Sequence, residues 1–325
     1  GYDRGGRWER MTDIVVLRQA VHGLPIEDYA AAIRDALPDR EVTLARTPAE
    51  ERDLVGRAEV ATGLHVDDDM LDAAGDLRLF ACLYAGVDHL PLDALEERDV
   101  AVTSASGVHA PNVAEHVVGA IVAFSRAFPT AWRQQERREW RHIQSRDLAG
   151  STVTVVGLGA IGQGTVEALT GFDVHTIGVR RSPAKGGPTD EVLGTDRLHD
   201  ALARTDYLVL ACPLTEETEG LVGGAEFETL PTDAVLVNVA RGEVVDTDAL
   251  VTALQREDVR GAQLDVTDPE PLPEDHPLWG LDNVFVTPHS AGFTPAYYER
   301  RAAILAENLR RVAETGLYED LRNQV

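Results

Sequence analysis

The chain has 325 residues, and its 55 Asp and Glu against 30 Lys and Arg give a formal net charge of −25. This length exceeds the roughly 250 to 300 residues at which a single hydrophobic core stops growing, so two domains are expected. The charge argues against nonspecific binding to nucleic acid or to an anionic membrane surface, because both are polyanions that the protein repels.

Short β-branched segments alternate with amphipathic segments along the chain after Met11. Such alternation is typical of βαβ units around a parallel sheet. The sequence therefore predicts an α/β fold with two series of strands. The first series is expected at 14–17, 59–62, 77–81 and 100–103, and the second at 152–156, 174–179, 207–211, 235–239, 262–266 and 284–287.

Two long helices indicate the domain boundaries. A mostly apolar helix is predicted at 111–128, between the two series, and a helix rich in Arg and Ala at 295–315, after the second series. The last helix is able to return to the first sheet, which would make the first domain discontinuous. We therefore expect a substrate domain of residues 1–108 with 293–325 and a dinucleotide-binding domain of residues 109–292.

Several smaller features have structural interpretations. Residues 1–10 are interpreted as an extension before Met11. Cys82 and Cys212 offer neither a disulfide framework nor metal-ligand spacing, as suits a reducing cytoplasm. The three acids at 67–69 are interpreted as a helix cap and first turn, where carboxylates accept from free N–H groups, rather than as a metal site. No metal is predicted, and no stretch approaches the ~20 apolar residues of a membrane span.

A glycine-rich motif follows the first strand of the second series and opens a helix at once. This is the context that the dinucleotide-binding fingerprint G-x-G-x-x-G requires, although a plain glycine-rich turn is the alternative. Gly157 suits a tight turn, Gly159 lets the backbone approach a pyrophosphate, and Gly162 allows close packing of the helix. Free N–H groups at the helix start, including those of Ala160 and Ile161, are then predicted to bind the phosphates.

The end of the next strand selects between NAD and NADP. An acidic residue there would bind the ribose 2′-hydroxyl of NAD and repel a phosphate. This chain instead has Arg180, Arg181 and Ser182, and two guanidiniums with a hydroxyl suit a 2′-phosphate. We therefore predict NADP(H) in preference to NAD(H); a solvated arginine loop is the alternative.

Three further polar residues follow strands of the second series, where open α/β sheets bind ligands. They are Arg241, Glu270 and His289. A guanidinium can hold the carboxylate and carbonyl oxygens of a 2-oxo acid. An imidazolium supplies the proton that accompanies a hydride, and a carboxylate orients that ring and stabilises its charged form. Taken singly, each residue has a structural alternative: a salt bridge, a loop acid or a hydrogen-bonded histidine.

These motifs resemble those of the D-isomer-specific 2-hydroxyacid dehydrogenase family. The matching pieces, in chain order, are Ala85-Gly86-Val87-Asp88-His89, Val113-Ala114-Glu115-His116, the glycine motif, Asn238-Val239-Ala240-Arg241-Gly242, Leu264-Asp265-Val266 with Glu270-Pro271, and Thr287-Pro288-His289. The resemblance implies two doubly wound domains, Rossmann-like and flavodoxin-like, with the active site in the cleft between them. It assigns Arg241 to substrate binding and carbonyl polarisation, His289 to acid and base catalysis, and Glu270 to holding His289.

The resemblance also implies further contacts. Backbone N–H groups of Ala85, Gly86 and Val87 should meet the substrate carboxylate. Asp265 should face the nicotinamide carboxamide. Other cofactor contacts are expected at Cys212, Pro213, Val239 and Ala240.

Within the family, many members place Asp where the loop 180–182 stands. Arg-Arg-Ser loops instead look like those of the NADP-using glyoxylate/hydroxypyruvate reductases. The size of the substrate pocket is expected to depend on Leu64, Tyr84, Trp140 and Tyr297.

The segment 126–146 is locally positive, with six Arg, two Glu, Trp132 and Trp140. Trp and Arg are favoured at interfaces, and by resemblance the segment stands in the place of the family's dimerisation arm. We expect a homodimer formed through the cofactor domain and this arm. A solvated helix is the alternative, and nucleic-acid binding is opposed by the surrounding charge.

Taken together, the sequence predicts an NADP(H)-dependent reductase of 2-oxo acids to D-2-hydroxy acids, with the stereochemistry resting on the resemblance alone. A nucleotide-sensing, corepressor-like binding protein is the alternative from another class. A formate or phosphite dehydrogenase is the enzymatic alternative, although formate enzymes usually have Gln where Glu270 stands.

Lys185 is the only lysine in the chain. Lysine depletion with an excess of acid resembles cytoplasmic proteins of salt-accumulating archaea, where concentrated salt screens the repulsion between surface charges. A cytoplasmic, halophilic protein is therefore expected, with an ordinary acidic mesophile protein as the alternative.

Overall fold

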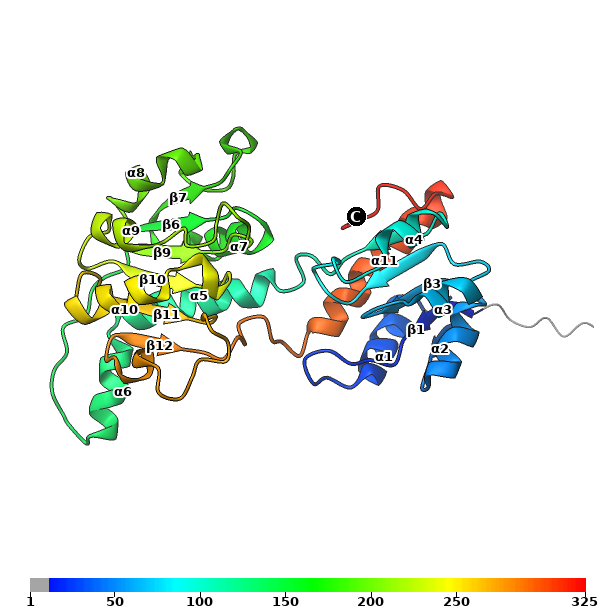
Figure 1. The fold of residues 1–325 in the computed structure, drawn as a ribbon, viewed down its shortest axis with the longest axis horizontal. Helices are drawn as coiled ribbons and strands as arrows, with labels where there is room; N and C mark the ends of the chain where they lie inside the picture. Colours follow the sequence, from blue (N-terminus) through cyan, green and yellow to red (C-terminus); the bar gives the residue numbers. More distant parts are fainter. Residues whose placement is uncertain (1–11) are drawn as a thin grey trace, which may run out of the picture. The chain divides into compact units, whose positions relative to one another are not determined.

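The computed structural model describes residues 12–325, so the predicted extension at 1–10 lies outside the described residues. The chain divides into two compact units, one of residues 12–108 with Thr294–Val325 and the other of His109–Phe293. The C-terminal helix therefore belongs to the first unit, where it packs against the first helix of the chain (Figure 1). Each unit is built around its own parallel sheet, which confirms the predicted fold class.

The first unit has five strands in the order β2-β1-β3-β4-β5, and every pair is parallel. This is the flavodoxin-like order 2-1-3-4-5, which binds ligands beyond the carboxyl ends of its strands. The strands are β1 (Thr12–Val16), β2 (Val42–Leu44), β3 (Ala58–Gly63), β4 (Leu79–Cys82) and β5 (Ala101–Thr103). The helices are α1 (Ile26–Ala36), α2 (Pro48–Val55), α3 (Asp68–Ala73), α4 (Leu92–Glu96) and α11 (Tyr297–Thr315).

Side chains that alternate along the strands of this unit fill two cores. In β1, Ile14 and Val16 pack with residues of α1 and α11, whereas Val15 packs with residues of α2 and α3. This alternation follows from the two-residue period of a strand. The sheet is thus covered on both faces, as a parallel sheet requires.

The second unit has seven strands in the order β12-β11-β10-β9-β6-β7-β8, all parallel. The chain reverses direction across the sheet between β6 and β9, and such a switch point is where open α/β sheets bind ligands. The strands are β6 (Thr152–Val156), β7 (His175–Val179), β8 (Glu191–Leu193), β9 (Tyr207–Leu210), β10 (Val235–Asn238), β11 (Gly261–Leu264) and β12 (Val284–Val286).

Helices cover both faces of this sheet as well (Figure 1). The α-helices are α5 (Ala110–Ser125), α6 (Phe128–Glu136), α7 (Ala160–Leu169), α8 (Leu198–Leu202), α9 (Gly224–Thr229) and α10 (Thr247–Arg256). Short 3₁₀ turns are η1 (Thr170–Phe172), η2 (Pro183–Lys185), η3 (Thr195–Arg197), η4 (Gly242–Val244) and η5 (Pro277–Gly280). None of the helices in residues 12–325 is long and apolar enough to cross a bilayer.

The structure corrects the sequence predictions in two places. Strands β2 and β8, each of three residues at a sheet edge, were not predicted. The apolar helix predicted at 111–128 is present as α5 (Ala110–Ser125), but it ends three residues earlier than predicted. Ala127 takes a left-handed φ of 57°, and α6 then begins with Pro129 in its first turn, since proline cannot continue the preceding helix.

The acidic run at 67–69 caps a helix, as predicted. Asp67 precedes α3, and its Oδ1 accepts from the backbone N–H of Met70 at 2.8 Å. The carboxylates of Asp68 and Asp69 lie in the first helical turn, where they complement the helix dipole.

Candidate active site

The loops that carry the three candidate catalytic residues leave the same edge of the second sheet. Strands β10, β11 and β12 are neighbours in register. Because parallel strands end at a common edge, the loops with Arg241, Glu270 and His289 begin side by side.

His289 lies in a loop that a buried carboxylate holds. Asp265 is buried, with 4% of the residue exposed. Its Oδ1 accepts from Thr287 Oγ1 at 2.6 Å and from the Ser290 N–H at 3.0 Å. The Ala291 N–H donates to Oδ1 at 3.1 Å and to Oδ2 at 3.0 Å. The Asp265 carbonyl also accepts from the His289 N–H at 2.8 Å. These bonds fix the backbone of His289 at a φ of 47°.

The imidazole of His289 pairs with Glu270. Nδ1 of His289 lies 2.6 Å from Oε1 of Glu270, and the two side chains are 48% and 41% exposed. A carboxylate accepts, so Nδ1 carries hydrogen and Nε2 is the nitrogen open to a substrate. Both residues line a cavity of about 340 Å³ together with Asp265, Trp279 and Leu272.

Arg241 does not line that cavity. Its Nη1 donates to the carbonyl oxygen of Ala240 at 2.6 Å, and the residue is exposed. Asn238 braces the turn, because its Oδ1 accepts from the Ala240 N–H at 3.0 Å and its Nδ2 donates to the Arg241 carbonyl at 2.9 Å. A Cβ on Gly242 would lie 2.1 Å from the carbonyl carbon of Thr267, so glycine is required where this turn packs against the loop that leads to the acid.

The glycine turn after β6 lies at the switch point of the sheet. Gly157 has a φ of 96°, and a Cβ there would lie 2.6 Å from Cα of Cys212, at the end of β9. A Cβ on Gly162 would lie 1.9 Å from the Gly157 carbonyl oxygen, so α7 packs directly on the turn. A Cβ on Gly159 would meet nothing within 4 Å, which leaves this backbone open to a ligand.

The start of α7 offers donors for phosphate oxygens. The first helical hydrogen bond runs from the Gln163 N–H to the Gly159 carbonyl at 2.9 Å, so the N–H groups of Ala160, Ile161 and Gly162 precede the helical ladder. An open glycine turn followed by free N–H groups fits a dinucleotide pyrophosphate. Of the neighbouring residues, Cys212, Val239 and Ala240 are buried at strand ends, whereas Pro213 is exposed.

The loop after β7 presents its arginines differently. Nη1 of Arg180 donates to the Gly186 carbonyl at 2.6 Å, so this guanidinium braces its own loop. Arg181 is exposed and lies 3.7 Å from Glu217 Oε2. Ser182 is exposed at the start of η2, which ends at Lys185.

In the first unit, the loop after β4 has unused donors. Ala85 and Gly86 are exposed, whereas Val87 is buried. Among residues 12–325, no acceptor is found for the backbone N–H groups of Ala85, Gly86 and Val87. Three successive free N–H groups are suited to an anion such as a carboxylate. We call Ala85–Gly86–Val87 the anion loop.

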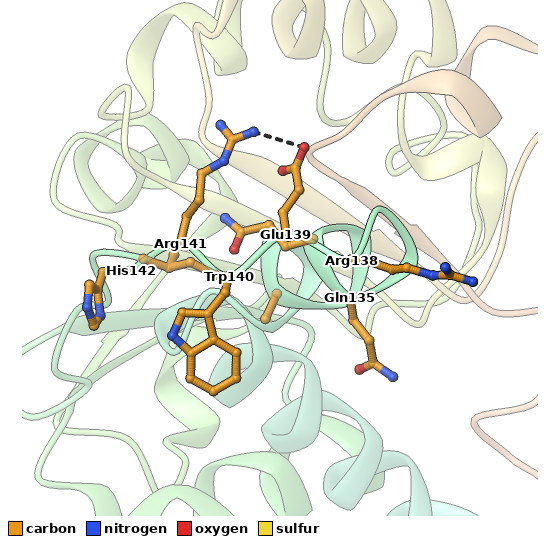
Figure 2. A pocket seen from close by; sticks show the side chains of 9 residues that line it. Gln135, Arg138, Glu139, Trp140, Arg141 and His142 are labelled. Atoms are coloured by element: carbon orange, nitrogen blue, oxygen red, sulfur yellow. Dashed lines mark ion pairs between the residues drawn. The ribbon is translucent and has the colours of Figure 1, made fainter.

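The arm predicted at 126–146 is α6 followed by an extended segment. A cavity of about 690 Å³ lies along it, and its lining includes Ala131, Gln134 and Ile143. Figure 2 shows Trp140 pointing to the side opposite the ion pair of Glu139 and Arg141, whose atoms are 2.8 Å apart.

Aromatic surface is unusually open on this arm. Trp140 is 97% exposed, and Phe128 and Trp132 are also exposed. Trp132 contacts Phe285 of β12, with ring centroids 5.7 Å apart. The described residues include no group of three or more His, Cys, Asp or Glu that could hold a metal ion.

Some site features were not evident from the sequence. The role of Asp265 in holding the His289 loop depends on side-chain bonds that no motif reveals. Tyr297, expected to affect pocket size, is fully buried. Its hydroxyl donates to the carbonyl oxygen of Leu83, two residues before the anion loop.

Comparisons with known proteins agree with the fold and the motifs. A model of the D-isomer specific 2-hydroxyacid dehydrogenase NAD-binding domain matches residues 118–291. D-3-phosphoglycerate dehydrogenase of Methanocaldococcus jannaschii is 31% identical over 307 residues, which span 92% of this chain but only 58% of that protein's length. Glyoxylate reductase/hydroxypyruvate reductase of Homo sapiens is 32% identical over 316 residues, covering 92% of this chain and 94% of that protein.

A solved structure is similar along almost the whole chain. The D-isomer specific 2-hydroxyacid dehydrogenase of Xanthobacter autotrophicus Py2, in complex with NADPH and MES, is 31% identical, with 97% of this chain and 98% of that chain covered and a TM-score of 0.77. Sequence, motif order and fold therefore agree, and the chain belongs to the D-isomer specific 2-hydroxyacid dehydrogenase family.

Proposed function

We propose that this protein is an NADP(H)-dependent reductase of 2-oxo acids to D-2-hydroxy acids. The observation that carries the proposal is the pair of His289 and Glu270 at 2.6 Å, in a cavity at the same sheet edge as the dinucleotide-binding turn. This arrangement offers a positioned proton donor where a carbonyl would be reduced.

Each candidate residue has a distinct task in this proposal. When bound, the nicotinamide supplies the hydride that the carbonyl carbon accepts. His289 gives the carbonyl oxygen its proton from Nε2, while Glu270 orients the ring through Nδ1 and stabilises its charged form. Arg241 turns from the Ala240 carbonyl to bind the carbonyl and carboxylate oxygens of the substrate. The anion loop of the first unit offers its free N–H groups to a carboxylate.

The substrate is tested by a steady-state screen of glyoxylate, hydroxypyruvate, pyruvate and longer 2-oxo acids, with NADPH and NADH, at low and high salt. Turnover of at least one of these acids is expected. Tight NADPH binding without turnover across the panel would favour the nucleotide-sensing alternative. Oxidation of formate or phosphite, with no 2-oxo acid reduced, would favour the other enzymatic alternative.

The preference for NADP(H) rests on the loop at 180–182, which has no acid to repel a 2′-phosphate. Replacing Arg181 with Ala is expected to raise KM for NADPH about 10-fold, because an exposed guanidinium is lost from the phosphate. KM for NADH should change little. Arg311→Ala, an exposed arginine on α11, is the matched control. A wild-type kcat/KM that favours NADH would contradict the preference.

Lys185 permits a second test that does not depend on catalysis. It is the only lysine, and it closes the turn η2 beside the same loop. Amine labelling read by mass spectrometry should be slowed at Lys185 by NADPH more than by NADH. Equal protection by both cofactors would argue against recognition of the 2′-phosphate here.

We further propose that the arm at 126–146 mediates a homodimer. Its open aromatic side chains and its arginines, within a chain of net charge −25, would be matched by acidic surface on a second copy. Light scattering after chromatography should show a dimer for the wild type. The double change Trp132→Ala and Trp140→Ala should yield monomer, and a monomeric wild type would contradict the proposal.

The excess of acid supports adaptation to high salt and a cytoplasmic location. Arg181 and Arg241 would then bind anionic ligands that the acidic protein surface repels. Because salt screens this repulsion, the ligands should reach the two arginines more easily as salt rises. KM for NADPH is expected to fall or stay level as salt rises. A steep rise with the fold intact would contradict this electrostatic account.

A further inference from the structure

Arg301 is a buried cation without an acidic partner. It lies in α11 and is 0% exposed, the largest fully buried side chain of the described chain. Its Nε donates to the Cys82 carbonyl oxygen at 3.0 Å. Within residues 12–325, neither Nη1 nor Nη2 has a hydrogen-bond partner, and no Asp or Glu forms an ion pair with it. Burial of an unpaired charge is costly, so its retention calls for an explanation.

The groups around Arg301 do not supply the missing negative charge. Tyr29, Tyr297 and Cys82 all feel its charge. Burial raises the pKa of each of these groups, and the favourable effect of Arg301 is smaller than this cost. The two phenols and the thiol are therefore neutral near pH 7, and the guanidinium keeps a net positive charge in this part of the unit.

The same helix holds the backbone that leads into the anion loop. Tyr297, one turn before Arg301 on α11, donates its hydroxyl to the Leu83 carbonyl oxygen. The next carbonyl, that of Tyr84, accepts from the Ala105 N–H at 2.8 Å. With the Arg301 bond, three successive carbonyl oxygens before the loop have protein donors. The N–H groups that follow, at 85–87, have no protein acceptor among the described residues.

The loop has acid beside it as well. A Cβ placed on Gly86 would lie 4.0 Å from Oδ2 of Asp88. A carboxylate ligand at the free N–H groups is therefore opposed by Asp88 and by the net charge of the chain. The buried positive charge of Arg301, which is bonded to the Cys82 carbonyl before the loop, offsets both effects.

We propose that Arg301 is a positioning residue for the substrate carboxylate: it holds the Cys82 carbonyl group that precedes the anion loop, and its unpaired charge favours an anion there. This inference rests on the proposed reduction of a 2-oxo acid. It assigns the recognition of the acid group to a side chain that does not touch the substrate, on a helix far from the loop in sequence.

The test compares Arg301→Met with the exposed control Arg311→Met on the same helix. In Arg301→Met, KM for the best 2-oxo acid should rise about 10-fold or more, with kcat within about 3-fold of the wild type. KM for an uncharged analogue, the methyl ester of the same acid, should stay within about 2-fold of the wild-type value, because the ester has no carboxylate charge for Arg301 to attract. The control should match the wild type in every measurement.

Equal weakening of the acid and its ester would overturn the proposal, since it would mean a purely structural role. An unchanged KM for the acid in a folded Arg301→Met protein would overturn it too. If Arg301→Met fails to fold, Tyr297→Phe decides the matter. That change removes the hydroxyl donor to the Leu83 carbonyl before the loop and should raise KM for the acid about 3-fold or more, with kcat retained. No change in KM would refute the inference.

Failure of the proposed function gives a different result. If the wild type reduces no 2-oxo acid, the binding of oxalate, measured by calorimetry with NADPH present, replaces KM as the readout. Weaker oxalate binding in Arg301→Met or Tyr297→Phe than in Arg311→Met then supports the role of Arg301. Equal oxalate binding in all three variants, or none to the wild type, counts against it.

Discussion

The two units hold their candidate binding loops with buried charges of opposite sign. In the first unit, the buried cation Arg301 donates to the Cys82 carbonyl before the anion loop. In the second unit, the buried anion Asp265 accepts from the N–H groups of Ser290 and Ala291, next to His289. The buried cation binds one carbonyl oxygen and the buried anion binds two N–H groups, so the two charges occupy opposite kinds of backbone group next to their loops.

The difference matches the chemistry expected of each loop. The anion loop keeps free N–H groups, which can bind a carboxylate without any charged side chain in contact with it. The loop of His289 has its N–H groups occupied and instead presents a side chain that carries a proton. The anion loop thus offers backbone donors, and the loop of His289 offers a side chain that carries a proton.

The largest expected effect comes from removing the imidazole of His289. His289→Ala should lower kcat by about 10²- to 10⁴-fold, the usual contribution of a positioned acid, while NADPH binding followed by fluorescence stays unchanged. His199→Ala is the matched control, because that histidine is exposed and pairs with Glu226 in the same unit. Near wild-type kcat on every 2-oxo acid in the His289 variant would refute the proposed chemistry.

Removing the buried carboxylate of Asp265 should have the next largest effect. Asp265→Ala leaves the N–H groups of Ser290 and Ala291 without their acceptor, and hydrogen bonds to charged groups are worth about 1.5–3 kcal/mol each. We expect a lower melting temperature and a fall in kcat, as His289 loses its fixed position. Asp265→Asn keeps one acceptor oxygen and should lose less of both. A folded Asp265→Ala protein with wild-type kcat would show that the carboxylate does not hold the catalytic loop.

A double variant tests whether the buried charges of Arg301 and Asp265 act independently of each other. Arg301→Met and Asp265→Asn lie in different units and share no hydrogen-bond partner. Their effects on kcat/KM, expressed as free energies, should add to within about 0.5 kcal/mol. A coupling above about 1 kcal/mol in the double-mutant cycle would instead mean that one loop depends on the other.

The smallest effect concerns an exposed acid of the second unit. Asp190 accepts from the N–H and the hydroxyl of Thr176 at 2.8 and 2.9 Å, and these bonds lower the pKa of its carboxyl. Because the folded pKa lies below the unfolded one, this stabilisation is present above the unfolded value and is lost as pH falls through the folded value.

Asp190→Asn should therefore lower the free energy of unfolding by less than about 1 kcal/mol at pH 7, and the difference from the wild type should shrink in acid. Melting temperatures between pH 7 and pH 3 check this expectation. A difference that is constant over that range would mean that the charge of Asp190 is not what stabilises the fold.

Most of the fold followed from local pattern. Strands such as β6 and β10 are continuous runs of β-branched and apolar residues, and both lie inside a sheet. The edge strands β2 and β8 were missed, whereas the equally short edge strands β5 and β12 were predicted, so shortness alone does not account for the difference. The end of α5 was placed three residues too late, at 128 instead of Ser125, because the left-handed backbone of Ala127 is not visible in composition.

The candidate site was predictable where a residue follows a strand. Arg241, Glu270 and His289 were identified because strand ends of a parallel sheet meet at one edge, and the structure brings the acid and the imidazole together at 2.6 Å. The orientation of Arg241 toward its own backbone was not predictable, since it depends on rotamers. Nor was the buried state of Tyr297, which depends on how α11 packs.

The sequence by itself determined the two parallel sheets, the glycine turn, the order of the family motifs and the acidic, lysine-poor surface, because each is written in neighbouring residues and their spacing. Only the tertiary structure decided which buried charge holds which loop. Arg301 and Cys82 are joined across 219 positions of sequence, and Asp265 and Ala291 across 26. Such bonds form between elements that meet only when the helices close over the sheets, and no local pattern encodes that meeting.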